Sequence, residues 1–130
     1  MVRKKDCTMW FVMDIIGQKW NIPIILELIN AIQSEKNTLN YTDLKNLIPD
    51  ISTKVLAMRL KYLTNEGVID RVDNELTPKK VRYRLSQSGR DLIPILEDLR
   101  KWSVKYGDCD NQTCIMGLCR HAITLEAVLK

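Results

Sequence analysis

The stretch ISTKVLAMRLKYLTNEGVIDR, residues 51–71, decides the fold that we expect for this chain. Ser52 is a good helix N-cap, because its hydroxyl can accept a hydrogen bond from a free backbone N–H of the first turn. Gly67 is a natural end for the same helix, since glycine adopts the left-handed conformation without a steric penalty. The residues between them therefore predict one helix, and the pattern changes at Val68.

This predicted helix has two unlike faces. At 100° per residue, three leucines fall on one stripe that must face a core: Leu56, Leu60 and Leu63. The opposite face is cationic and carries no acid, with Lys54, Met58 and Lys61 on its stripe and Ser52, Thr53 and Ala57 at the exposed front. Such a face suits the major groove of DNA, and the first turn favours a phosphate. The alternative is an ordinary amphipathic surface helix, with Arg59 at its flank pairing with an acid.

A pattern of period two follows the helix. Residues 68–72 and 81–85 are strand candidates, and the second run alternates apolar with basic side chains. The residues between them include Asn74 and Pro78, which suit a hairpin tip. In such a hairpin, Arg82 and Arg84 point away from the buried face.

The predicted hairpin concentrates positive charge, with four cations within six residues: Lys79, Lys80, Arg82 and Arg84. As a DNA-binding wing it would contact phosphates or the minor groove, and Lys79, Lys80 and Arg82 are favoured for this over Arg84. The alternative is that these cations only protect an exposed strand edge from pairing with another chain.

Helical patterns lie on both sides of the predicted helix and hairpin. Before it we expect helices over about 10–16 and 22–33, and a short third helix for which Thr42 is the N-cap. After it we expect a long helix over about 88–106, in which Pro94 predicts a kink or a later start. The result is a mainly α (α+β) winged helix-turn-helix fold with a two-stranded wing and extra N- and C-terminal helices.

The length and composition of the chain limit the number of domains and the class of protein. The chain of 130 residues, 45% hydrophobic and 28% charged, has room for one domain with a true core. We divide it into a winged helix-turn-helix domain over residues 1–107 and a cysteine-containing tail over residues 108–130, expected to be helical and packed on a dimer. The longest apolar runs fall short of the roughly 20 residues of a membrane span, and no leader pattern follows the basic start. We therefore expect a cytoplasmic protein.

The distribution of charge points to the middle of the chain. Residues 41–90 carry ten Lys or Arg against six Asp or Glu, a net of +4, which equals the net charge of the whole chain. A polyanion would be bound in this region, although the charge alone fits a solvated basic surface equally well.

These motifs together resemble the HxlR-type winged helix-turn-helix regulators. The resemblance rests on Cys7 before the first helix, DIIGQKW at residues 14–20, the stretch 51–71, and KVRYRLSQSG at residues 80–89. It covers about residues 7–106. One departure is Lys80, which stands where the family usually has a wing arginine, so the charge stays but the planar fork is lost.

The resemblance implies a homodimer, built through the terminal helices, that binds duplex DNA at inverted repeats. The apolar stretch Met9, Trp10, Phe11 and Met13 fits a dimer interface or core, the alternative being an effector pocket between dimer helices.

The resemblance also makes Cys7 a redox candidate, since some members respond to oxidants at this position. A helix start and three nearby cations would stabilise its thiolate. The alternative is a small buried residue at the interface.

The tail holds three cysteines and the single histidine of the chain: Cys109, Cys114, Cys119 and His121. Four such ligands suffice for one zinc ion, but the C-x-x-C knuckle of structural zinc sites is missing, and a continuous helix cannot gather all three thiols. Free thiols, a disulfide, zinc and an iron–sulfur cluster all stay open.

These features favour one of three classes of function. A DNA-binding transcription regulator, acting without a cofactor, fits best. A winged-helix module used only for protein–protein contact should lack the cationic helix face and wing. An enzyme is disfavoured, because the sequence has no phosphate-binding glycine loop and no arrangement of catalytic groups.

Overall fold

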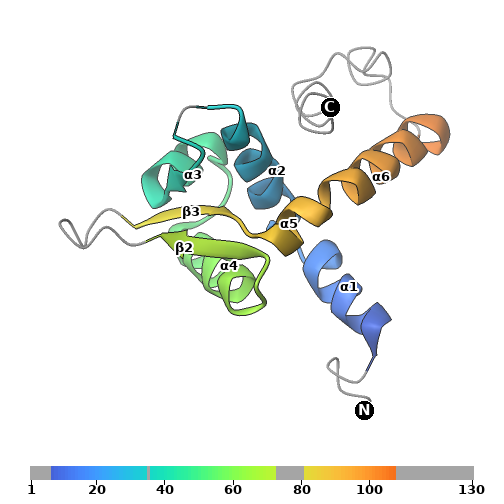
Figure 1. The fold of residues 1–130 in the computed structure, drawn as a ribbon, viewed down its shortest axis with the longest axis horizontal. Coiled ribbons are helices and arrows are strands. Elements are labelled where there is room, and N and C mark those ends of the chain that lie inside the picture. The colour runs from blue at the N-terminus through green and yellow to red at the C-terminus, as the bar shows by residue number, and fades with distance from the viewer. Residues whose placement is uncertain (1–6, 35, 73–80, 108–130) are drawn as a thin grey trace.

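The computed structural model describes residues 7–34, 36–72 and 81–107. The helices and strands follow one another along the chain as shown in Figure 1. Their bounds are α1 Thr8–Gly17, α2 Asn21–Ile32, β1 Leu39–Asn40, α3 Tyr41–Leu47, α4 Thr53–Asn65, β2 Ile69–Val72, β3 Arg82–Leu85, α5 Gln87–Asp91 and α6 Ile93–Tyr106.

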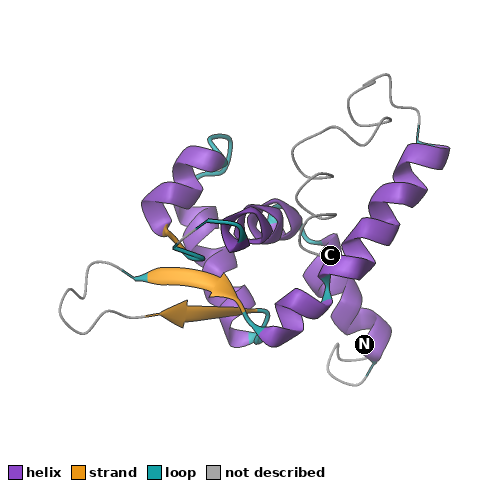
Figure 2. Ribbon diagram, turned by 45° about the horizontal axis from the view of Figure 1, so that its top comes forward, coloured by secondary structure: helices purple, strands orange, loops and turns teal. Residues whose placement is uncertain are grey.

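A small antiparallel sheet stands beside the helices (Figure 2). Its strand order is β1-β3-β2, so β3 is central and pairs Leu39 with Tyr83 on one side and Arg71 with Tyr83 on the other. The sequence predicts the β2–β3 hairpin and misses β1, because a strand of two residues has no periodicity to detect.

The core lies between α2, α4 and the sheet. The predicted leucine stripe of α4 is confirmed, since Leu56, Leu60 and Leu63 are at most 1% exposed. They pack in one cluster with isoleucines of α2 and with Ile69 and Leu85 of the wing strands. The outer face of α4 is thus presented on a rigid base.

The start of α3 differs from the prediction. Asn40, not Thr42, is the N-cap: its Oδ1 accepts from the Asp43 N–H at 2.7 Å, and Asp43 Oδ2 accepts from the Asn40 N–H at 3.0 Å. The two side chains form a reciprocal capping box, which satisfies two backbone donors where a threonine alone would satisfy one.

The long C-terminal helix is interrupted as Pro94 predicts. The chain forms the short helix α5 and then α6, which begins at Ile93 with Pro94 in its first turn, where a missing N–H costs nothing. Gly89 of α5 is buried against the sheet. The tail over residues 108–130, which is expected to be helical, lies outside the described residues.

The helices α1 and α6 extend from the end of the molecule opposite the wing strands (Figure 1). None of the helices in the described ranges is both long and apolar enough to span a membrane.

Candidate nucleic-acid interface

The start of α4 is held in place from two sides. The Ser52 hydroxyl accepts from the Val55 N–H at 3.1 Å, which confirms Ser52 as the N-cap. The Tyr41 hydroxyl of α3 donates to the Thr53 carbonyl oxygen at 2.8 Å. The remaining N–H groups of this first turn point outward at the positive end of the helix dipole, which suits an anion.

The outer face of α4 is exposed as the sequence predicts. Its Met58 is 52% exposed although it is a large apolar side chain. All the residues assigned to this face are exposed: Ser52, Thr53, Lys54, Ala57, Met58 and Lys61. The face is therefore free to enter a groove, with lysines at both ends and small or apolar side chains between them.

Arg59 ties α4 to the turn between α1 and α2. Its Nη1 donates to Gln18 Oε1, an amide oxygen and not the acid that the sequence suggests. The turn itself is ordered by Asn21, whose Nδ2 donates to the carbonyl oxygens of Asp14 and Ile15, both at 3.1 Å. Sequence reasoning missed this link, because nothing in the local pattern of either residue signals a partner 41 positions away.

Tyr62 lies on the flank of α4 that turns toward α1. Burial raises the pKa of Tyr62 above its ordinary value of 10.0, and the negative charges of Asp14 and Glu66 raise it further, against the opposing effect of Arg59. The phenol is therefore neutral at any physiological pH, and it adds no charge to the interface.

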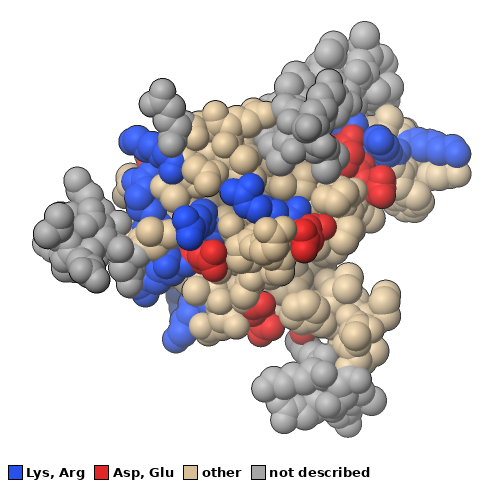
Figure 3. All heavy atoms as spheres, viewed as in Figure 1, with Lys and Arg blue, Asp and Glu red and all other residues tan. Residues whose placement is uncertain are grey.

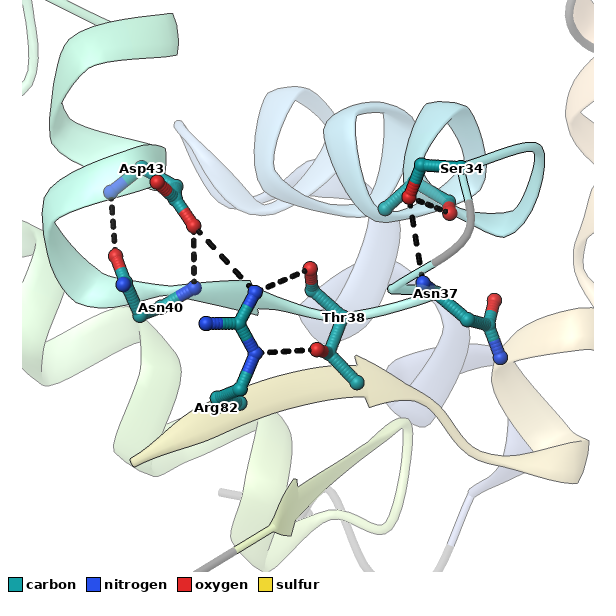
Figure 4. Close-up of polar contacts among 7 residues, drawn as sticks. Ser34, Asn37, Thr38, Asn40, Asp43 and Arg82 are labelled. Carbon is teal, nitrogen blue, oxygen red and sulfur yellow. Dashed lines mark hydrogen bonds and ion pairs between the residues drawn. The ribbon is translucent and has the colours of Figure 1, made fainter. Parts of the chain in front are cut away.

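Arg82 has partners that the sequence does not reveal. Its guanidinium turns toward β1 and α3 (Figure 4). Its Nε donates to Thr38 Oγ1, its Nη2 donates to the Thr38 carbonyl oxygen at 3.0 Å, and Nη2 lies 3.7 Å from Asp43 Oδ2. The pairing of β1 with β3 brings these acceptors beside it, and β1 is the strand that the sequence does not reveal.

The other described wing cation, Arg84, is partly neutralised. Its Nε lies 3.8 Å from Asp70 Oδ2 across the β2–β3 pair, and both side chains are about half exposed. The rank of Arg84 below Arg82 as a DNA contact stays a prediction. Lys79 and Lys80 lie outside the described residues, so their place in the interface stays a prediction.

Charge gathers on the side of the molecule that carries the wing. On the face shown in Figure 3, Lys and Arg side chains cluster near the outer ends of β2 and β3. An interface made of α4 and the wing would thus meet a polyanion with a cationic side.

An apolar surface occupies the opposite end of the molecule. On α1, five consecutive large apolar residues are each more than 40% exposed: Met9, Trp10, Phe11, Val12 and Met13. On α6 the same holds for Ile95, Leu99, Trp102 and Tyr106, and the rings of Trp102 and Tyr106 lie 5.8 Å apart. Exposed apolar surface of this extent, on the two helices that frame one end, is typical of interaction sites.

Cys7 stands at the N-cap position of α1. It is a half-buried free cysteine, and its carbonyl oxygen accepts from the Phe11 N–H at 3.2 Å. The thiol is thus partly accessible and adjoins the apolar surface of α1. Cys109, Cys114, Cys119 and His121 lie outside the described residues, and no metal-ligating cluster occurs within the described ones.

The helix pair α3–α4, the preceding α2 and the sheet behind them define a winged helix-turn-helix protein. A model of the HxlR-like helix-turn-helix family matches residues 15–111. The chain is 35% identical over 107 residues to YdzF of Bacillus subtilis (strain 168), an uncharacterized HTH-type transcriptional regulator, covering 82% of this chain and 94% of YdzF.

Two solved structures have the same fold. The reduced form of the transcriptional regulator YodB from B. subtilis superposes with a TM-score of 0.68 at 27% identity, over 78% of this chain and 95% of YodB. The redox regulator HypR in its reduced form gives a TM-score of 0.63 at 25% identity, over 78% of this chain and 95% of HypR. The chain belongs to the HxlR-like helix-turn-helix family, a family of transcription regulators and not of enzymes.

Proposed function

We propose that this chain is a cytoplasmic transcription regulator that binds duplex DNA sequence-specifically, as a homodimer on inverted-repeat sites. The observation that carries the proposal is the outer face of α4, which is exposed and cationic and is backed by a buried leucine stripe. A face of this kind presents side chains to base edges at positions that the core keeps constant.

Each part of the interface has a separate role in this proposal. The first turn of α4, with Ser52 and Thr53, approaches a phosphate, while Lys54, Ala57, Met58 and Lys61 line the groove. The wing, with Lys79 and Lys80, reaches the flanking backbone or the minor groove. Arg82 belongs to the wing root, where its bonds to Thr38 add to the pairing of β3 with β1.

Dimerisation follows from the apolar surface of α1 and α6. A two-fold axis through this surface buries the same side chains of both copies against each other. It leaves the wing of each copy directed outward, because the outer ends of β2 and β3 lie at the other end of the molecule (Figure 1). The two copies of α4 would then read half-sites about one helical turn, roughly 34 Å, apart.

Lys54→Ala tests the assignment of α4. If Lys54 contacts a base, specific binding weakens by about 1–3 kcal/mol, while binding to unrelated duplex changes little. The measurement is a titration of fluorescent duplexes, one holding a site selected in vitro with the whole protein and one with that site scrambled. Lys101→Ala is the matched control, since it removes the same charge from an exposed position on α6. Equal affinity of Lys54→Ala and wild type for the selected site would contradict the assignment.

We propose that Cys7 makes DNA binding responsive to thiol oxidation. The support is its partial exposure beside the apolar α1 surface, together with the likeness to YodB and to the redox regulator HypR. A disulfide formed by Cys7 at the proposed dimer interface would tilt one copy of the chain against the other. The tilt would change the spacing of the two α4 helices.

Diamide treatment is expected to change the operator affinity of the wild type and to leave Cys7→Ser unchanged. The comparison variant has Cys109, Cys114 and Cys119 all replaced by serine, because these thiols could be resolving partners or react by themselves. Binding is measured for all three proteins in reduced and treated form. An unchanged wild type excludes sensing by this route, and a response that disappears only in the tail variant assigns it to the tail.

A further inference from the structure

A small pocket of about 200 Å³ lies between α1, the end of α4 and the start of α5. Two of the side chains that line it, Glu66 and Ser88, are polar. The other lining side chains are apolar: Phe11, Val12, Ile15, Ile16, Val68 and Leu92. All of these residues belong to one chain, so this pocket differs from an effector pocket between the helices of a dimer.

The helical spacing of α1 creates the apolar wall of the pocket. Phe11 and Ile15 are one turn apart, as are Val12 and Ile16, so each pair lies on one side of the helix. Ile15 is buried in the core, whereas Phe11 is 45% exposed. This side of α1 therefore leaves the core at the pocket, and its apolar side chains are accessible there to a ligand.

The polar edge of the pocket offers hydrogen-bond acceptors. Glu66 is the C-cap of α4, at the negative end of the helix dipole, and it forms no ion pair within the described part of the chain. The Ser88 hydroxyl donates to the Gly67 carbonyl oxygen at 2.7 Å. Ser86 Oγ lies 3.1 Å from Ser88 Oγ, but a hydroxyl oxygen has two lone pairs, so one is left for a ligand. Such an edge selects a positively charged donor.

We propose that this pocket binds a small organic cation, with one apolar ring and one ammonium group, as an effector of the regulator. The ring packs against α1 and Leu92, and the ammonium group donates to Glu66 and Ser88. The volume fits this class of ligand. An apolar cavity of about 150 Å³ holds benzene, so about 200 Å³ holds one ring with a short arm.

The effector role rests on the proposed function and on the position of the pocket. The turn after α1 is tied to α4 by the bond between Gln18 and Arg59. The first turns of α1, with Phe11 and Val12, form one wall of the pocket and also belong to the apolar surface proposed for the dimer. A ligand between α1 and α5 would therefore change the angle of α1, and with it the spacing of the two α4 helices.

Calorimetric titration with benzylammonium tests the site, because this ion has one ring, a short arm and one positive charge. Benzyl alcohol is the neutral ligand of the same shape. The wild type is expected to bind benzylammonium about fivefold more tightly than benzyl alcohol, and Glu66→Gln should remove this preference. Asp50→Asn, which removes a carboxylate from an exposed position outside the pocket, should keep it. A preference that is missing in the wild type, or kept in Glu66→Gln, would overturn the cation site.

A second variant tests the shape of the pocket. Val12→Phe fills part of the space without changing charge, and it is expected to weaken the binding of both ligands by about tenfold. Val12 is 41% exposed, so the larger side chain can be accommodated, and thermal melting checks that each variant is folded. Binding that Val12→Phe leaves unchanged would place the ligand elsewhere and overturn the assignment. If Trp102→Glu, which is designed to be a monomer, binds benzylammonium and the wild type does not, a second copy covers the pocket and the ligand site fails.

The effector role is tested with the duplex selected in vitro with the whole protein. Benzylammonium, compared with ammonium chloride at equal ionic strength, should change the affinity of the wild type for this duplex and leave that of Val12→Phe unchanged. If the ligand binds and the affinity of the wild type for the duplex stays the same, the effector role fails. If the wild type binds no duplex at all, the proposed function fails, while calorimetry still decides the ligand site.

Discussion

Trp102→Glu is expected to be a monomer at micromolar concentration and to bind an inverted-repeat duplex at least about 100-fold more weakly, because linked binding of two half-sites is lost. Trp102 is 62% exposed on α6 in the isolated chain and packs beside Tyr106, so the substitution costs the fold of the single chain little. In a dimer the same position is covered, and a buried carboxylate without a partner is strongly unfavourable.

Sedimentation velocity over a range of concentrations measures the assembly, and the duplex titration measures its effect on DNA binding. Lys101→Glu provides the control, since it places the same carboxylate on the preceding residue of α6, at an exposed position on the side of the helix away from the apolar stripe. A Trp102→Glu variant that sediments as a dimer would rule out this surface as the dimer interface.

Gly89→Ala is expected to lower the free energy of unfolding by about 1–3 kcal/mol or more, as overpacking of a core does. A Cβ at this position would lie 2.3 Å from the Val68 carbonyl oxygen and 2.9 Å from Leu85 Cδ2. That oxygen cannot move aside freely, because it accepts from the Ser86 N–H at 3.1 Å and from the Ser86 hydroxyl at 2.9 Å. The helix α5 must therefore shift away from the sheet.

Urea unfolding of Gly89→Ala and Gly17→Ala tests this contact. A Cβ at Gly17 would meet no atom of the described residues within 4 Å, so Gly17→Ala is expected to be neutral or to stabilise by up to about 1 kcal/mol. Equal stability of the two variants would show that α5 does not depend on this close approach. Because α6 continues directly from α5, a shifted α5 would also weaken dimerisation.

The parts of the fold that the sequence predicts are those specified locally. The bounds of α4 follow from Ser52 and Gly67, and its buried stripe follows from leucine spacing. The later start of α6 follows from the restricted backbone of Pro94. Each of these depends on side chains within a few positions of one another, so a pattern in the chain is enough to detect it.

The parts that were missed depend on contacts between distant segments. Arg82 bonds Thr38, which lies 44 positions earlier, and the bond from Arg59 to Gln18 spans 41 positions. The pocket between α1 and α5 also joins residues from separate parts of the chain. Of the candidate interface, the exposed α4 face was predictable from helical spacing, whereas the partners at the wing root became visible only through the pairing of β3 with two strands.

The division of α4 into a buried and an exposed face has a consequence for how such regulators diverge. Leu56, Leu60 and Leu63 stabilise the fold, while Lys54, Ala57 and Met58 point outward and contribute little to the core. Substitutions at outward positions usually change stability by about 0.5 kcal/mol or less. After gene duplication, a copy could therefore acquire a new operator preference through the outer face alone. Selection for a different target and selection for a folded chain would act on separate sets of residues in the same helix.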